Sequence, residues 1–233
     1  DIADYMPLIT TDSLQSVYYT GGEPFINGEQ WDLLQQLIDQ GISHNIKLSY
    51  NTNLSTLHYK DRDILELWQQ FKSVSVMVSI DAVGEKFNYI RSGGDWDRVE
   101  KNIKLLEVYQ SKYNNLTMNI ACTVSILNIW SIPELLQYFR NYQITLTDLH
   151  YPDYLALTTI PDELQDLALR CVDDIEVLYP NKNKCDFFRQ QIRNNNTKHL
   201  FRDTVMQTLL LDRVRNEKLF DFLPFKPVAL QLL

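Results

Sequence analysis

Cysteine is scarce in this chain. Only three cysteines occur among 233 residues, at Cys122, Cys171 and Cys185, and no two of them stand in a CxxC arrangement. An odd and widely spaced set argues against a disulfide framework and favours a reducing, cytoplasmic setting. The same spacing assembles neither a zinc site nor an iron–sulfur ligand set.

Long hydrophobic runs and the common nucleotide motifs are lacking too. No apolar stretch approaches the roughly 20 residues that span a bilayer, and no signal-peptide pattern opens the chain, so no membrane partner is expected. The formal net charge of −8 argues against a nucleic-acid partner. The absence of a G-x-G-x-x-G turn, a phosphate loop, an H-E-x-x-H helix and a Ser-His-Asp arrangement disfavours the corresponding nucleotide-binding and hydrolytic proteins.

What the sequence does contain is a repeated alternation of strand, polar loop and helix. Short β-branched or aromatic runs predict strands at 17–19, 46–50, 74–80, 116–124 and 144–149, with helical patterns between them. Repeats of roughly 30 residues imply right-handed crossovers and a parallel sheet. The predicted fold class is therefore α/β, a partial (β/α) barrel of parallel strands with C-terminal helices.

The pattern changes after residue 155. We expect residues 1–155 to form the core and residues 156–233 to form a helical extension packed on it. Within the extension, the Asn- and Lys-rich stretch 181–198 is predicted to be a solvated connection containing a short helical piece. The apolar end, 220–233, is expected to pack back on the domain. In the core, residues 61–71 are predicted to form one helix.

A glycine pair, an acid and a proline follow the first predicted strand, at Gly21, Gly22, Glu23 and Pro24. Glycines let a backbone adopt positive φ and approach a ligand closely, and a carboxylate can accept hydrogen bonds from an ammonium group. Pro24 removes a donor and stiffens the exit from the turn. In the alternative interpretation, Glu23 is a surface acid that caps the next helix.

Further polar residues follow the second and third strands. Asn51 ends the second strand, Asp81 ends the third, and Arg91 lies in the short segment after it. The carboxyl ends of parallel strands meet at one edge of a sheet, which makes all three candidate ligand groups. Structural alternatives stay open: Asn51 can satisfy a turn and Asp81 can cap the following helix. Arg91 can pair with Glu85 or Asp95.

Several of these segments together resemble the radical S-adenosylmethionine (SAM) enzymes. The GGEP turn at 21–24 resembles the turn after the second strand of that family. Ser79-Ile80-Asp81 resembles its fourth-strand motif, and the stretch ending in Tyr89-Ile90-Arg91 resembles the segment that follows. Residues 212–217 are similar to the C-terminal signature of the twitch-domain subgroup. The resemblance covers nearly the whole chain and implies a radical SAM core without its first strand.

The resemblance also implies a cofactor chemistry. In this family a [4Fe-4S] cluster, held by a CxxxCxxC loop, reduces SAM to a 5′-deoxyadenosyl radical that abstracts hydrogen from a substrate. By resemblance, Gly21, Gly22 and Glu23 hold the methionine ammonium of SAM.

The remaining implied contacts concern the other polar groups of SAM. Ser79 and Arg91 contact the methionine carboxylate, whereas Asp81 and Asn51 lie near the ribose. An acid, an always-charged guanidinium and short polar groups suit an ammonium, a carboxylate and a diol. The full cofactor-binding set implied by the resemblance is Gly21, Gly22, Glu23, Pro24, Asn51, Ser79, Asp81 and Arg91.

One part of the family pattern is missing, because no CxxxCxxC occurs in the 233 residues. We favour the interpretation that a segment upstream of Asp1 carries the cluster ligands and packs on the core, in which case this chain alone is inactive. The alternative is a degenerate, non-catalytic module that binds SAM or a partner. A third, weaker hypothesis is an ordinary (β/α) barrel enzyme with Glu23 and Asp81 as acid and base. Members of the family modify peptides, proteins and small molecules, so the substrate class stays open.

Overall fold

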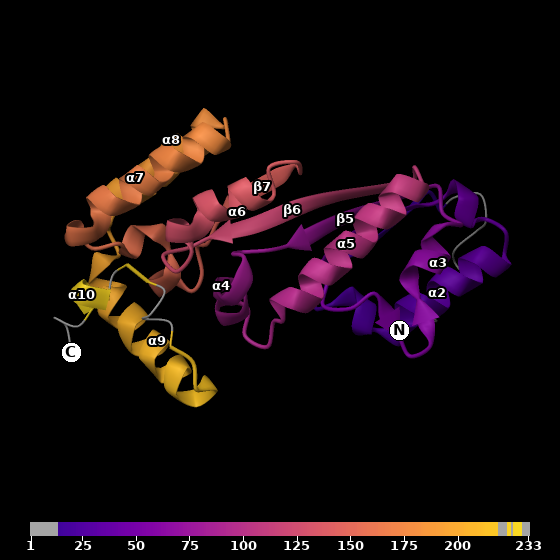
Figure 1. Ribbon diagram of the computed structural model, residues 1–233, viewed down its shortest axis with the longest axis horizontal. Coiled ribbons are helices and arrows are strands. Elements are labelled where there is room, and N and C mark those ends of the chain that lie inside the picture. Colours follow the sequence, from indigo (N-terminus) through magenta and orange to yellow (C-terminus); the bar gives the residue numbers. More distant parts are fainter. Residues whose placement is uncertain (1–13, 219–222, 225, 230–233) are drawn as a thin grey trace. The chain divides into compact units, whose positions relative to one another are not determined.

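The computed structural model describes residues 14–218, 223–224 and 226–229. Within these residues a mostly parallel five-stranded sheet has the strand order β1-β2-β5-β6-β7, of which β5, β6 and β7 are labelled in Figure 1. The strands are β1 (Ser16–Tyr19), β2 (Lys47–Thr52), β5 (Ser73–Ser79), β6 (Leu116–Val124) and β7 (Ile144–Asp148). The predicted α/β class is confirmed, and each of the predicted strands is present.

The chain forms two compact units that interleave along the sequence. Unit 1 comprises Asp1–Ser79 and Asp95–Ile120, and unit 2 comprises Ile80–Gly94 and Ala121–Leu233. The sequence-based division into residues 1–155 and 156–233 stays a prediction.

Unit 1 contains β1, β2, β5 and the start of β6. Its α-helices in the described residues are α2 (Gly28–Asp39), α3 (Ile64–Trp68) and α5 (Trp96–Lys112), of which α2 and α3 lie side by side (Figure 1). Strand β2 is parallel to both neighbours, with Lys47 opposite Ser16 of β1 and Ser73 of β5. The carboxyl ends of β1, β2 and β5 therefore lie at one edge of the sheet, as predicted for parallel strands.

The core of unit 1 is aromatic. The ring of Trp68 lies 5.3 Å from the ring of Tyr50 and 5.8 Å from that of Phe25, centroid to centroid. Trp31 is fully buried, and its indole N–H donates to the Phe25 carbonyl at 3.2 Å. Burial of each large apolar side chain stabilises the fold by about 1.5–3 kcal/mol. These rings hold the short 3-10 helix η2 (Pro24–Ile26), which begins directly after the glycine pair and Glu23.

The prediction of one helix over residues 61–71 is wrong at both ends. Residues 58–63 form a hairpin of β3 (His58–Tyr59) and β4 (Arg62–Asp63), and helix α3 is shorter than predicted. The hairpin turns at Lys60, whose φ is 56°. Asp63 then caps α3 by accepting a hydrogen bond from the Leu65 N–H at 2.8 Å. The helical pattern therefore begins three residues later than the sequence indicates.

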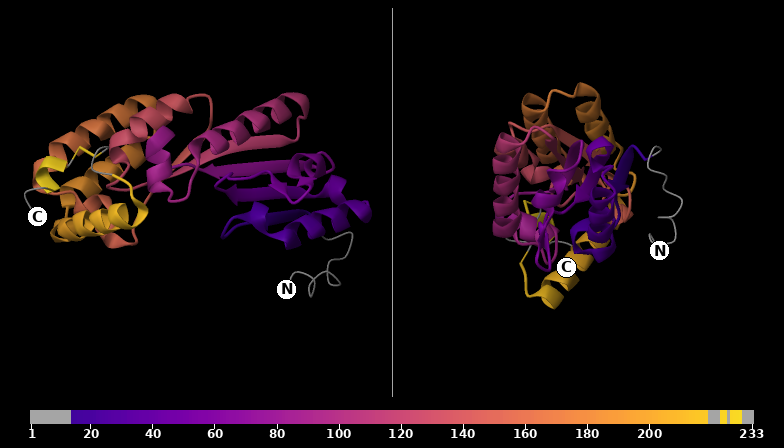
Figure 2. Two further views of the ribbon diagram at one scale, coloured as in Figure 1. Left: turned by 60° about the horizontal axis from the view of Figure 1, so that its bottom comes forward. Right: turned by 90° about the vertical axis from the view of Figure 1, so that its right-hand side faces the viewer.

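Unit 2 contains the end of β6, β7 and most of the helices. The α-helices in its described residues are α4 (Gly84–Ile90), α6 (Ile132–Tyr138), α7 (Asp162–Leu178), α8 (Lys182–Asn194), α9 (Phe201–Arg215) and α10 (Lys226–Ala229). Helices α7 and α8 lie side by side as an antiparallel pair (Figures 1 and 2). The short 3-10 helices of the two units, besides η2, are η3 (Ser43–Asn45), η4 (Ile129–Ser131), η5 (Asp153–Leu155), η6 (Leu157–Thr159) and η7 (Lys198–Leu200).

Helix α8 is a second correction, because most of the predicted connection at 181–198 is helical. Cys185, Phe188 and Ile192 are buried at intervals of three and four residues, which makes a narrow apolar face. Their many Asn and Lys neighbours hide that face in the sequence. The predicted packing of residues 220–233 lies largely outside the described residues. No helix in the described ranges has both the length and the apolarity to cross a bilayer.

Candidate functional site

The glycine pair after β1 leaves its backbone open. Gly21 and Gly22 are exposed and have φ values of 81° and 57°. Apart from the adjoining residues, no atom of the described part of the chain lies within 4 Å of the position that a Cβ would occupy at either residue. Glycine adopts this left-handed geometry without strain, and a ligand could approach the bare backbone closely.

Glu23 is fixed by three hydrogen bonds from neutral donors. Its Oε1 accepts from the Thr52 hydroxyl at 2.6 Å and from the Phe25 N–H at 3.3 Å, and its Oε2 accepts from the Asn53 N–H at 2.8 Å. The bond from Phe25 caps η2, so Glu23 does cap the short helix that follows it. It is half-buried and not a surface acid, and the cap of α2 is Asn27. A carboxylate has about four acceptor positions. With respect to the described residues, one position therefore remains on Oε2 for a further donor, such as an ammonium group.

The other predicted site residues of unit 1 lie at strand ends. Asn51 donates from Nδ2 to the Tyr18 hydroxyl at 2.7 Å, which links β2 to β1 instead of satisfying a turn. Ser79 is the last residue of β5 and is partly exposed. Pro24 is buried at the start of η2.

In unit 2, Asp81 and Arg91 form an ion pair. Arg91 Nη2 lies 2.8 Å from Asp81 Oδ2, and the two side chains are 28% and 13% exposed. Asp81 Oδ1 also accepts from the Thr123 N–H at 2.8 Å. The N-cap of helix α4 is Val83, and no side chain of the described residues caps this helix, so the alternative that Asp81 caps it is wrong. The acid that pairs with Arg91 is Asp81, which the sequence-based alternatives of Glu85 and Asp95 missed.

The Arg91 guanidinium keeps donors for a further acceptor. It carries five N–H donors. Its Nε is buried and, within the described part of the chain, has no hydrogen-bond partner. A buried donor left without a partner costs about 1–3 kcal/mol. A ligand cannot reach a nitrogen buried in this way, so a ligand carboxylate would have to meet one of the other N–H groups of this side chain, which is 28% exposed.

Asn128 fixes the loop that contains Asp81. This fully buried side chain donates from Nδ2 to the carbonyls of Asp81 and Thr123, both at 2.9 Å, and accepts from the Ser125 N–H at 2.7 Å. Sequence reasoning gave no site role to Asn128 or to Thr52. Both lie at or just after the end of a strand, and that position is the signal that could have identified them.

The three thiols do not make a cluster site. Cys122 and Cys185 are buried, Cys171 is half-buried, and all three are free. Burial raises the pKa of each thiol, which disfavours the thiolate form that iron requires. Among the described residues, no three His, Cys, Asp or Glu side chains gather as ligands of a metal ion. The side chains of the described residues therefore do not provide the ligands of a [4Fe-4S] cluster.

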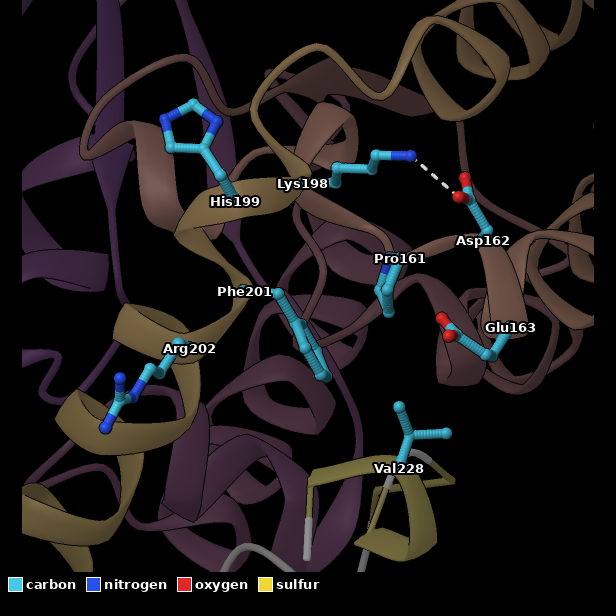
Figure 3. Close-up of a pocket in the computed structure, with 8 residues that line it drawn as sticks. All are labelled: Pro161, Asp162, Glu163, Lys198, His199, Phe201, Arg202 and Val228. Atoms are coloured by element: carbon cyan, nitrogen blue, oxygen red, sulfur yellow. Dashed lines mark hydrogen bonds and ion pairs between the residues drawn. The ribbon is translucent and has the colours of Figure 1, made fainter. Parts of the chain in front are cut away.

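A pocket of about 360 Å³ lies in unit 2 near the starts of α7 and α9 (Figure 3). The Lys198 ammonium bonds Asp162 at 2.6 Å on one side of it, and His199 and Arg202 point away from that pair (Figure 3). The lining residues are Pro161, Asp162, Glu163, Lys198, His199, Phe201, Arg202 and Val228. None of them belongs to the predicted SAM-binding set, so this pocket gives no support to a SAM site there.

Comparison with known proteins identifies the family. A model described as the Radical SAM superfamily matches residues 2–139, which include all of the predicted cofactor-binding residues. No curated protein matches the chain.

Solved structures with a similar fold include native anSMEcpe with bound AdoMet and a Cp18Cys peptide, at 18% identity and a TM-score of 0.48, covering 71% of this chain and 48% of that one. A histidine-tagged form of anSMEcpe with bound AdoMet is similar at 19% identity and a TM-score of 0.49, covering 71% and 46%. This chain thus spans about half the length of the structures it matches. Because the family model matches more than half of its residues, the chain belongs to the radical SAM superfamily.

Proposed function

We propose that this chain is the SAM-binding core of a radical SAM enzyme whose [4Fe-4S] cluster is held by residues outside these 233. Membership of the superfamily supports SAM and an iron–sulfur cluster as the cofactors. The twitch-domain subtype is part of the proposal, and so is a cytoplasmic location, where thiols stay reduced. When bound, SAM and the cluster would supply the radical chemistry of the family.

One observation carries the proposal most directly: Glu23 presents a fixed carboxylate beside an open glycine backbone. Three neutral donors hold Glu23 without cancelling its charge, and one acceptor position remains. A charge-assisted hydrogen bond to an ammonium suits that position. We assign the methionine ammonium of SAM to Gly21, Gly22 and Glu23, with Pro24 stiffening the same turn.

The other proposed contacts concern the carboxylate and the ribose of SAM. Arg91 would give an accessible N–H of its guanidinium to the methionine carboxylate, and Ser79 would add a hydroxyl. Asp81 and Asn51 are proposed near the ribose. Asp81 already binds Arg91 and Thr123, so its first task is to orient the guanidinium.

Calorimetric titration of SAM into the chain tests the binding half of the proposal. We expect saturable binding at one site, weakened in Glu23→Gln by about 1–3 kcal/mol because a charged hydrogen bond is lost. Glu29→Gln is the matched control, since Glu29 is an exposed acid on α2. Absence of saturable binding, or equal affinities for the two variants, would contradict the proposal.

The choice between an enzyme and a non-catalytic module requires the full-length gene product. Anaerobic reconstitution with iron and sulfide, followed by incubation with dithionite and SAM, is expected to yield 5′-deoxyadenosine. SAM binding without that product would support the module instead. Turnover without iron or SAM would support the ordinary barrel enzyme. We propose a peptide or small-molecule substrate, in keeping with the net charge of −8, which disfavours nucleic acid.

A further inference from the structure

Arg91 is held in place by a contact from the C-terminal part of the chain. It follows helix α4 directly as its C-cap, and its N–H donates to the Phe87 carbonyl at 2.9 Å. Two residues earlier, the buried Tyr89 donates its hydroxyl to Asp212 Oδ1 of helix α9 at 2.7 Å. The two partners are 123 residues apart in the sequence and belong to the same compact unit.

The Tyr89–Asp212 bond has a fixed direction. Burial, and then the bond to Asp212, raise the pKa of the Tyr89 phenol above its ordinary value. The phenol therefore stays protonated and donates, and the carboxylate accepts. Asp212 itself lies in the last turn of α9, where the Glu217 N–H donates to its carbonyl at 2.9 Å. The Asp212 carboxylate therefore belongs to a helix end whose backbone is hydrogen-bonded.

The other side of Arg91 is equally constrained. The Gly94 N–H donates to the Arg91 carbonyl at 2.6 Å, and a Cβ at Gly94 would lie 2.6 Å from that same oxygen. The guanidinium then reaches Asp81 at 2.8 Å. With the turn to Gly94 closed on one side and Tyr89 bonded on the other, the backbone of Arg91 has little freedom to shift.

We propose that Asp212 is a positioning residue for SAM: through Tyr89 it holds the end of α4 and so sets where the Arg91 guanidinium meets the methionine carboxylate. The inference rests on the proposed function and extends it, because it makes helix α9 a determinant of carboxylate recognition. Loss of the Tyr89–Asp212 bond should then affect only ligands that carry the carboxylate.

The test compares SAM with decarboxylated SAM, which keeps the ammonium, sulfonium and nucleoside. In calorimetric titrations of the full chain, Tyr89→Phe and Asp212→Ala should each weaken SAM binding by about 2–10-fold, the range of one hydrogen bond. Their affinity for decarboxylated SAM should stay unchanged. Asp212→Asn keeps an acceptor oxygen and should restore SAM binding.

Tyr109→Phe is the matched control. Tyr109 is a buried tyrosine of α5 in unit 1, and its hydroxyl donates to Asn115 of the same unit at 3.2 Å. This variant should leave both affinities unchanged. Equal weakening of both ligands in Tyr89→Phe, or no weakening of either, would overturn the inference.

Hydrogen exchange of the ligand-free chain provides a second arm. Tyr89→Phe and Asp212→Ala should accelerate exchange at the Arg91 and Gly94 amides several-fold, whereas Tyr109→Phe should not. Unchanged exchange at those two amides would overturn the inference even if SAM binds. If the wild-type chain binds no SAM, the proposed function fails, and this arm still decides whether Tyr89 and Asp212 position Arg91.

Discussion

Glu23 in unit 1 and Arg91 in unit 2 are the two charged groups assigned to the amino-acid end of SAM, and they are held in opposite ways. Neutral donors surround Glu23: a hydroxyl and two backbone N–H groups. A carboxylate of opposite charge holds Arg91. Glu23 therefore keeps its full charge, whereas the charge of Arg91 is largely cancelled by Asp81.

The difference indicates two kinds of recognition. A carboxylate fixed by neutral groups attracts a cation through charge as well as through its remaining acceptor. A guanidinium that is already paired with an acid contributes to ligand binding mainly through directional hydrogen bonds from its remaining N–H donors. For SAM affinity, loss of the charge should therefore have its largest effect at Glu23. Changes that shift the position of the guanidinium should have their largest effect at Arg91.

The largest expected effect comes from breaking the ion pair of unit 2. Asp81→Ala leaves the guanidinium of Arg91 without its acid and the Thr123 N–H without its acceptor, so we expect a loss of about 3 kcal/mol in the free energy of unfolding. Urea denaturation measures it. A loss below about 1 kcal/mol would show that the pair behaves as an exposed salt bridge and would remove one side of the comparison.

A smaller loss is expected at Glu23. Glu23→Ala deprives the Thr52 hydroxyl and the Asn53 N–H of their acceptor, so we expect the free energy of unfolding to fall by about 1–3 kcal/mol. Glu23→Gln keeps an acceptor and should restore part of that stability while still binding SAM weakly. If Glu23→Gln bound SAM as tightly as the wild type, charge would not be what Glu23 contributes.

The glycine turn sharpens the comparison further. Gly22→Ala should lower stability by about 1–2 kcal/mol, since an L-residue is strained at a φ of 57°. Gly41→Ala is the matched control, because Gly41 has a φ of 72° and equally open surroundings. Both variants should lose similar stability in urea denaturation, but only Gly22→Ala should weaken SAM binding. Equal SAM affinities of the two variants would show that the glycine turn does not contact the cofactor.

The smallest effect should come from an exposed ion pair on the same helix as Tyr89. Lys86 of α4 lies 2.6 Å from Glu134, but the two side chains are 35% and 52% exposed. Glu134→Ala should therefore change the free energy of unfolding by less than about 1 kcal/mol and leave SAM affinity unchanged. A loss of free energy of unfolding as large as that of Asp81→Ala would mean that solvent exposure does not determine how strongly an ion pair of unit 2 stabilises the fold.

Local features of this molecule could be predicted from its sequence. The strands follow β-branched runs, and the glycine turn follows the first strand, because both depend on neighbouring residues. The partners of Glu23 and Asp81 could not be predicted in the same way. Thr52 reaches Glu23 from 29 positions away, and Thr123 reaches Asp81 from 42, so each bond depends on how strands align in the sheet.

Most of helix α8 escaped prediction for a different reason, because only a short helical piece was expected within residues 181–198. Only three buried side chains mark its inner face, and the Asn- and Lys-rich segments that flank them are typical of a solvated loop. Arg189, Gln190 and Gln191 favour a helix, and the packing of the three buried residues stabilises it. The predicted site has the opposite character, since its residues are distinctive in type but their grouping depends on tertiary structure.

A crystal structure of the chain with SAM would show whether Glu23 and Arg91 bind the same cofactor. We expect a single SAM molecule whose ammonium lies within hydrogen-bond distance of Glu23 and whose carboxylate lies within hydrogen-bond distance of Arg91. A SAM molecule that contacts neither side chain, or one that sits in the pocket beside Phe201, would contradict this expectation.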